Sequence, residues 1–270
     1  MPSKNGKAAA MTNTRDATLR VVSYNILNGG EDRLPLLADA ITALDADVVG
    51  FQEANEPANI ARLADELGYH HALARSQVSP YHVAIMSRRP LVDVEDLTPR
   101  APAMQRAAVR AIVDIAGEAW CFVVLHLSPG HGSFEREALR LRELDDLLPL
   151  VAERTLPTVM MGDFNATAPY HHHLRDGVRL EPIDDAEAEG TIPRHVGRRL
   201  VDVGWIDAVH TARSDAMLQS VTTQSPTTRV DYIWLSEQLA GRLIDADVAQ
   251  NDITRDASDH FPVWAALRMG

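Results

Sequence analysis

The chain has 270 residues, of which 46% are hydrophobic and 24% charged, a composition typical of a soluble globular protein. Its net charge at neutral pH is −12, from 26 basic and 38 acidic residues, which argues against a broad basic surface for non-specific nucleic-acid binding. The single cysteine, Cys121, excludes an internal disulfide and a metal site built from several cysteines.

Signals for a membrane or for export are absent from the pattern of apolar residues. No apolar run approaches the ~20 residues that a membrane-spanning helix needs, and the first 18 residues are polar and rich in alanine. We therefore expect a disordered tail at residues 1–18, a single domain at residues 19–270, no transmembrane segment and a cytoplasmic location. The sequence indicates no obligate protein partner.

In chain order, the first predicted element is a strand at residues 19–27, which the turn residues Asn28-Gly-Gly30 end. A stripe of leucine and isoleucine predicts a helix at residues 31–44. A buried strand at 47–53 and a helix at 58–67 follow.

The middle of the chain is predicted to be rich in strands. Ser133 is a good N-cap for a long amphipathic helix at residues 134–154. Before it, short apolar runs separated by Gly and Pro predict strands at 69–75, 81–87 and 91–97 and a hairpin of strands at 106–115 and 119–127.

A further strand, around Val159-Met-Met161, is apolar on both faces and ends in Gly162-Asp-Phe-Asn165. Residues 168–193 are irregular and are predicted to be a long surface loop or short helices; His171-His-His173, within them, is expected in a surface loop. The rest of the chain is predicted to contain a helix at 196–203 and strands at 229–235, 243–249 and 262–267.

The strands do not alternate strictly with helices, because several neighbouring pairs resemble hairpins. This order favours two mixed or antiparallel sheets with helices outside them over a doubly wound parallel sheet. No linker rich in Gly, Ser or Pro divides the chain, which fits one domain.

Polar side chains occur at or near the ends of six separate apolar segments. Asp163 and Asn165 lie two residues apart, so both point to one side if the chain stays extended. Taken singly, each such residue is a common turn former or solvated group. Burying them separately would cost roughly 1–3 kcal/mol each if unpaired, so we expect them to meet at one site. The others are Asn25, Glu53, His126, Asp231, Asp259 and His260.

The order of these motifs resembles the endonuclease/exonuclease/phosphatase superfamily, the DNase I-like phosphoesterases. The resemblance extends from about residue 19 to residue 268. It implies a four-layer αββα sandwich with the site at one edge of both sheets, and a divalent cation, usually Mg²⁺, with Mn²⁺ as a substitute. It rests on Ser23-Tyr-Asn25, Gln52-Glu53, His126-Leu127, Gly162-Asp-Phe-Asn165, Arg229-Val-Asp-Tyr-Ile233 and Ser258-Asp-His260.

The resemblance also implies roles for these residues. Glu53, Asn25 and Asp259 match the metal site. Asp163 matches the group that orients or deprotonates the attacking water, and Asn165 would hold that water or a phosphoryl oxygen. His260 matches the catalytic imidazole, with Asp231 as its partner and His126 as a second donor. An aspartate on one ring nitrogen favours the imidazolium, so we expect His260 to act mainly as a cationic donor, with general-base action as the rival account.

The expected function is hydrolysis of a phosphodiester in a nucleic acid, a nucleotide or a phospholipid head group, by metal-assisted in-line attack of water. A phosphomonoesterase of the same superfamily and an inactive binding module are the alternatives. Arg106 opens a strand and could reach a phosphate, although an arginine there is more often solvated. The low aromatic content, 5%, leaves few platforms for stacking bases and favours a small phosphate ester.

Overall fold

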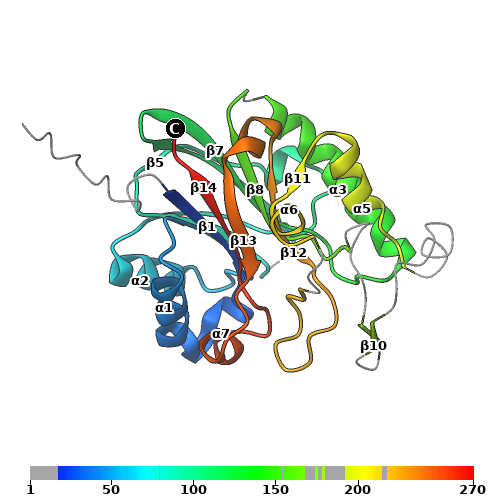
Figure 1. Ribbon diagram of the computed structural model, residues 1–270, viewed down its shortest axis with the longest axis horizontal. Coiled ribbons are helices and arrows are strands. Elements are labelled where there is room, and N and C mark those ends of the chain that lie inside the picture. Colours follow the sequence, from blue (N-terminus) through cyan, green and yellow to red (C-terminus); the bar gives the residue numbers. More distant parts are fainter. Residues whose placement is uncertain are drawn as a thin grey trace, which may run out of the picture.

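The protein is described here from a computed structural model that covers residues 18–78, 80–153, 155–167, 174–175, 178–179, 192–214 and 218–270. Two six-stranded sheets form its centre (Figure 1). In spatial order, the first sheet contains β13 (Leu243–Val248), β14 (Val263–Arg268), β1 (Thr18–Asn25), β2 (Val48–Gln52), β4 (Val83–Ser87) and β3 (His70–Ala74). The second contains β11 (Ile206–Asp207), β12 (Asp231–Leu235), β8 (Thr158–Asp163), β7 (Glu118–His126), β6 (Ala107–Ile115) and β5 (Leu91–Asp96).

Both sheets are mixed, as the sequence predicts. Only the neighbours β1 and β2 in the first sheet and β7 and β8 in the second are parallel, and the other described pairs are antiparallel. A separate pair of two-residue strands is formed by β9 (Leu174–Arg175) and β10 (Val178–Arg179).

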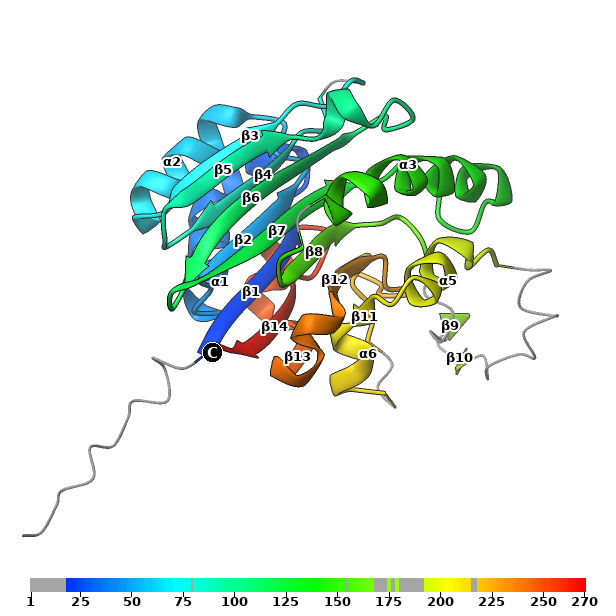
Figure 2. The same cartoon turned by 90° about the horizontal axis from the view of Figure 1, so that it is seen from above.

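Helices cover the outer faces of both sheets, on opposite sides of the molecule (Figure 2). Helices α1 (Leu34–Ala43) and α2 (Pro57–Leu67) pack on the first sheet. Helices α3 (Phe134–Ala152) and α5 (His195–Asp202) pack on the second. The expected four-layer αββα sandwich is therefore confirmed. The remaining helices of the described residues are α6 (Ala208–Ala212), α7 (Asp252–Ala257) and the 3₁₀ turns η2 (Asn28–Arg33), η3 (Thr98–Arg100) and η4 (Glu237–Arg242).

The inner strands β2, β4 and β8 are buried along their whole length because the sheets are covered on both faces there, whereas β3, β5 and β13 carry exposed residues. In β7, Phe122 and Val124 face the other sheet, whereas Cys121 and Val123 face the helices, so the alternate side chains fill two different cores. The sheets approach closely at Gly50, where an added Cβ would lie 2.8 Å from a methyl group of Val124. Cys121 is a buried core thiol.

Two details differ from the sequence prediction. The helix expected from residue 31 begins at Leu34, because Gly29, Gly30 and Glu31 all have positive φ, which is not helical and kinks the chain within η2. The short elements β11, α6 and α7 were not predicted. Most of the loop expected at 168–193, with His171-His-His173, and residues 1–17 of the expected tail lie outside the described residues. No helix in the described residues is long and apolar enough to cross a membrane.

Candidate active site

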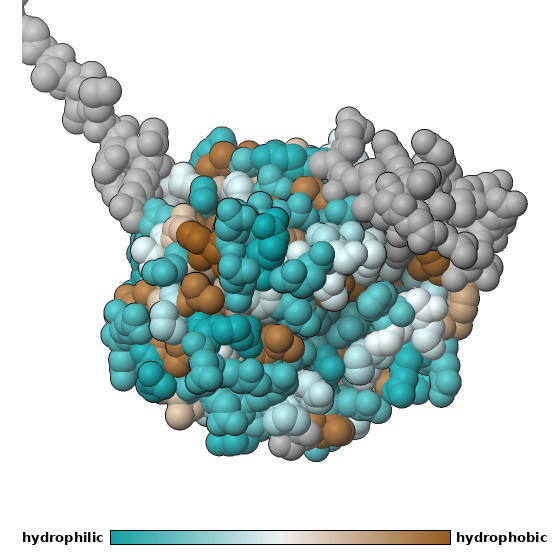
Figure 3. Space-filling model, turned by 90° about the horizontal axis from the view of Figure 1, so that it is seen from below, coloured by the Kyte–Doolittle hydropathy of each residue, from teal (hydrophilic) through white to brown (hydrophobic). Residues whose placement is uncertain are grey.

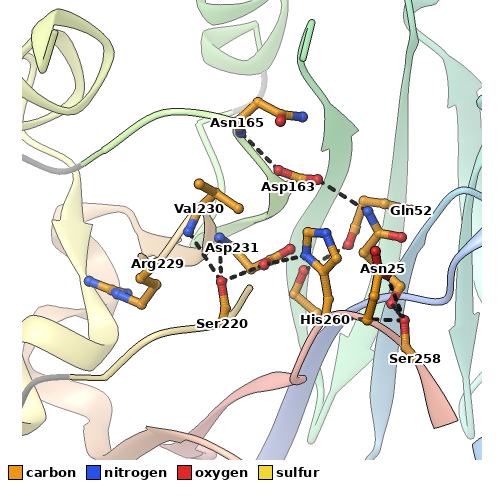
Figure 4. Close-up of polar contacts among 12 residues, drawn as sticks. Asn25, Gln52, Asp163, Asn165, Ser220, Arg229, Val230, Asp231, Ser258 and His260 are labelled. Atoms are coloured by element: carbon orange, nitrogen blue, oxygen red, sulfur yellow. Dashed lines mark hydrogen bonds and ion pairs between the residues drawn. The ribbon is translucent and has the colours of Figure 1, made fainter. Parts of the chain in front are cut away.

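One rim of the sandwich collects the ends of strands from both sheets. Parallel pairing of β7 and β8 places His126 beside Asp163, and antiparallel pairing of β12 and β8 places Asp231 on the other side of Asp163. In the first sheet, β1 ends at Asn25, and His260 lies just before β14, which pairs with β1. The topology alone therefore brings these side chains together, as Figure 4 shows for those it labels.

The surface on this side of the molecule is mainly hydrophilic. The rim lies toward the bottom of Figure 1, near α7 and the loop that precedes β12, and Figure 3 shows the molecule from below. Apolar residues are scattered among polar ones on that face. Such a face suits a polar ligand better than an apolar one.

Asp163 and Asn165 contact each other through a turn. Asp163 Oδ1 accepts a hydrogen bond of 2.8 Å from the Asn165 backbone N–H, and Asn165 has a left-handed φ of 49°. The same-side prediction required an extended chain between these two residues. The chain is not extended here, and the two residues contact each other through this turn instead. Asp163 Oδ2 accepts from Asn25 Nδ2 at 3.1 Å, and Asn165 Nδ2 donates to the Leu127 carbonyl at 3.2 Å.

His260 and Asp231 form a buried pair. The Nδ1 atom of His260 lies 2.8 Å from Asp231 Oδ2, the same oxygen to which the Ser220 hydroxyl donates at 2.6 Å. Burial would lower the pKa of His260, but the charge of Asp231 and its hydrogen bond, together with the charges of Asp163 and Asp259, raise that pKa to about 10. The ring is therefore an imidazolium at neutral pH, and Nε2–H remains available as a donor.

The pKa of Asp163 is raised from its ordinary 3.8 to about 7. Burial is the main cause, and the charge of Asp231 adds to it, whereas the positive charges of His260 and Arg106 oppose it. A carboxyl with such a pKa exchanges a proton close to neutral pH. It is suited to orienting a water molecule and accepting its proton.

His126 is fully buried and neutral. Burial, followed by the charges of Arg106 and His260, holds its pKa well below the usual range. Its Nε2 atom contacts the Arg106 guanidinium and lies 3.1 Å from Asp163 Oδ2. Because a guanidinium only donates, this nitrogen accepts from Arg106. Donation from His126 to substrate, which the sequence predicted, stays a prediction.

The three expected metal ligands occupy the same rim. Glu53 follows β2 with a positive φ of 57°, and its carboxylate accepts from the Asn28 backbone N–H at 3.0 Å and from Asn25 Nδ2 at 3.4 Å. The Asn25 backbone carbonyl accepts from Ser258 Oγ at 2.7 Å, which fixes the segment that carries Asp259. Asn25 thus connects Glu53, Asp163 and the segment of Asp259.

These residues fit a hard divalent cation. Glu53 and Asp259 are partly exposed carboxylates, and no basic side chain among the described residues forms an ion pair with either. Another cluster, Asp163, Asp231 and His260, has ligand atoms within 4.8 Å of one another. An imidazolium whose Nδ1 is bound to Asp231 is a poor metal ligand, so the partly exposed carboxylates of Glu53 and Asp259 fit a cation better than this cluster does.

Two buried residues at the rim were missed or undervalued from sequence. Ser220 lies in a polar loop and showed no signal, yet its hydroxyl contacts Asp231 and accepts the Val230 and Asp231 backbone N–H groups. For Arg106 the sequence left a phosphate contact and a solvated side chain open, with the solvated side chain as the commoner case, and the structure buries it against His126. Residue 162 is a glycine for a structural reason, because an added Cβ would overlap the Leu125 carbonyl of the neighbouring strand.

The comparisons with known proteins agree with the fold. A model of the Endonuclease/Exonuclease/phosphatase family matches residues 22–260. No curated protein sequence matches the chain. The 3′ phosphatase NExo from Neisseria is similar in structure, with a TM-score of 0.70 and 21% identity over 92% of this chain and 98% of that one.

Two further solved structures are similar at comparable levels. An AP endonuclease from Archaeoglobus fulgidus has a TM-score of 0.68 and 20% identity, and covers 92% of this chain and 99% of its own. The human Nocturnin catalytic domain has a TM-score of 0.66 and 20% identity over 93% of each chain. At such low sequence identities, the structural similarity is evidence for a shared fold only.

Proposed function

Because the chain belongs to the endonuclease/exonuclease/phosphatase family and is a hydrolase of phosphoric ester bonds, we propose that this rim hydrolyses a phosphodiester with a divalent cation. The proposed substrate is a nucleic acid, a nucleotide or a phospholipid head group. One observation carries the proposal: a carboxyl with a pKa of about 7 and an imidazole with a pKa of about 10 share the rim. Environments that push two pKa values apart assign a base and an acid.

The proposed division of work follows from those protonation states. Between the two pKa values, Asp163 is a carboxylate that orients the attacking water and takes its proton, and Asn165 places the water or a phosphoryl oxygen with its amide. His260, held by Asp231, donates from Nε2 to the phosphoryl group. Opposite unit charges 4 Å apart are worth ~4 kcal/mol at an effective dielectric of 20, about three decades in rate.

We assign the cation to Glu53, Asn25 and Asp259, with Mg²⁺ preferred and Mn²⁺ as a substitute. When bound, the cation polarises the phosphoryl oxygens and neutralises the charge that develops on them. Calorimetric titration with Mg²⁺ tests this. Glu53→Gln is expected to weaken binding at least about tenfold, whereas Glu56→Gln, an exposed glutamate nearby, is not. Equal affinities in the two variants would remove Glu53 from the site.

A panel assay tests the function. Bis-p-nitrophenyl phosphate, plasmid DNA, RNA, sphingomyelin and phosphoinositides are incubated in Mg²⁺, in Mn²⁺ and in EDTA. A DNA hairpin with a 3′ phosphate is added, because the structure of the Neisseria phosphatase was solved with a product DNA hairpin. It also tests the monoesterase alternative.

We expect metal-dependent turnover of at least one diester, abolished in Asp163→Asn and kept in Asp145→Asn, which changes an exposed aspartate on α3. Near-native turnover by a folded Asp163→Asn protein would refute the assignment of the base. Turnover of monoesters alone would transfer the proposal to a phosphomonoesterase.

A further inference from the structure

Arg106 differs from three other buried arginines in what surrounds its charge. Arg110, Arg140 and Arg229 are at most 1% exposed, and each forms an ion pair with a carboxylate. Arg106 is 7% exposed. Among the described residues, no carboxylate forms an ion pair with it.

The partners that Arg106 does have are neutral. Its guanidinium donates to Nε2 of His126, whose ring is uncharged, and its Cζ atom lies 4.3 Å above the centre of the Tyr81 ring. A cation–π contact orients a guanidinium but leaves its charge in place. A buried charge without a counter-ion is unfavourable, and proteins rarely retain one unless a ligand completes it.

The position of this charge points to the ligand. Arg106 directly precedes β6, and the register of β6 with β7 pairs its neighbour Ala107 with His126. The Nε2 atom of His126 that accepts from Arg106 also lies 3.1 Å from Asp163 Oδ2. One side chain therefore separates the guanidinium from the carboxyl that handles water under the proposed function. An anion bound to Arg106 would lie at the reacting group.

We propose that Arg106, oriented by Tyr81, binds a non-bridging oxygen of the substrate's phosphoryl group. This inference rests on the proposed function of the same rim. The planar guanidinium matches the geometry of a phosphoryl group, which can accept two parallel hydrogen bonds from it. Arg106 approaches from the β6–β7 side of the rim, while His260 approaches from the segment before β14, so the phosphoryl group is held between two cations.

The same reasoning predicts opposite effects of two matched substitutions. Arg106 and Arg110 lie four residues apart, Arg110 within β6 and Arg106 directly before it. Replacing Arg106 by methionine removes a charge without a partner, so the urea midpoint is expected to stay or rise. Replacing Arg110 by methionine leaves Glu95 without its buried partner, so the midpoint is expected to fall.

Binding is measured by calorimetry with inorganic phosphate in the presence of Mg²⁺, together with KM for whichever ester the panel identifies. Arg106→Met is expected to weaken phosphate binding by about 10- to 100-fold, the loss of a hydrogen bond to a charged group. Arg110→Met is expected to leave it unchanged. Arg106→Lys keeps the charge but loses the planar pair of N–H donors, so its phosphate affinity is expected to lie between those of Arg106→Met and the parent protein.

Tyr81 gives an independent comparison that leaves Arg106 in place. Tyr81→Phe keeps the aromatic face and is expected to bind phosphate as the parent does, whereas Tyr81→Leu is expected to bind it more weakly. These variants keep the test decisive even if Arg106→Met does not fold.

Unchanged phosphate affinity in Arg106→Lys and Tyr81→Leu would overturn the inference, and so would the absence of phosphate binding by the parent protein. If the Arg106 variants hydrolyse the ester with an unaltered KM, the inference about Arg106 is wrong and the proposed function stands. If the protein binds phosphate through Arg106 but hydrolyses no ester of the panel, the inference about Arg106 stands and the proposed function is wrong.

Discussion

Replacement of Asp163 by asparagine is expected to stabilise the metal-free protein above neutral pH while it abolishes hydrolysis. In the folded protein, burial and the neighbouring charge of Asp231 raise the pKa of Asp163 from 3.8 to about 7. The folded state therefore holds this proton more tightly than the unfolded state does. Stability is lost as pH rises from the unfolded value to the folded value, and the loss is complete above about pH 7.

The size of the effect follows from the two pKa values. A difference of about 3 units, at 1.36 kcal/mol per unit, corresponds to about 4 kcal/mol across the whole window. Most of that window lies above about pH 5. The deprotonation of Asp163 should therefore lower the parent's free energy of unfolding by about 2–3 kcal/mol between about pH 5 and about pH 9. An asparagine does not titrate, so the Asp163→Asn protein escapes that loss. A constant penalty of about 1–3 kcal/mol applies at every pH, because the new amide meets the donor Asn25 Nδ2.

Urea unfolding in EDTA, at the two pH values, measures the difference between variant and parent. That difference should shift by about 2–3 kcal/mol in favour of the variant at the higher pH. Asp145→Asn, at an exposed position, is the control and should differ from the parent equally at both values. A difference for Asp163→Asn that does not change with pH would refute the reasoning from burial.

Three further outcomes are expected. The rate of hydrolysis of bis-p-nitrophenyl phosphate should rise as Asp163 loses its proton near pH 7 and fall as His260 loses its proton near pH 10. Asp231→Asn should move the alkaline limb of this pH profile to lower pH. An alkaline limb that does not move would contradict the pairing of His260 with Asp231. Ser220→Ala should lower kcat with little change in KM, and should lower the free energy of unfolding by about 1–3 kcal/mol because two backbone N–H groups lose their acceptor. Ser220→Thr should restore both kcat and stability. A loss of stability without a loss of kcat would show that the serine has a purely structural role. Gly162→Ala should lower the urea midpoint sharply, since its Cβ overlaps a backbone carbonyl of β7, and a midpoint equal to the parent's would contradict that packing.

The layers of the fold were predictable because burial on both faces leaves a strong signal. Runs such as Val159-Met-Met161 are typical of a strand in a sheet that is covered on both sides, and all three residues are fully buried. The short elements gave no such signal. Helix α7 is six residues long, and its start depends on a capping box between Asn251 and Thr254 rather than on an apolar stripe. Its packing against α1 is set by the tertiary structure.

The candidate site was predictable where a polar residue of the rim ends an apolar run, as Glu53, His126 and Asp163 do. Such residues are visible because the change from apolar to polar is abrupt. Ser220 and Arg106 were not visible in this way. Whether Arg106 is solvated or buried depends on Tyr81, which comes from another part of the chain, and no local pattern encodes that contact.

The arrangement around His126 explains how two opposite charges persist at the rim without cancelling each other. A direct ion pair between Arg106 and Asp163 would depress the pKa of the carboxyl and occupy the guanidinium. His126, fully buried and neutral, contacts both groups through the same ring nitrogen. We infer that it acts as a spacer, so that Asp163 titrates near neutral pH and Arg106 keeps a charge for the substrate. The buried, unpaired charge destabilises the rim, and the large apolar cores of both sheets offset that cost.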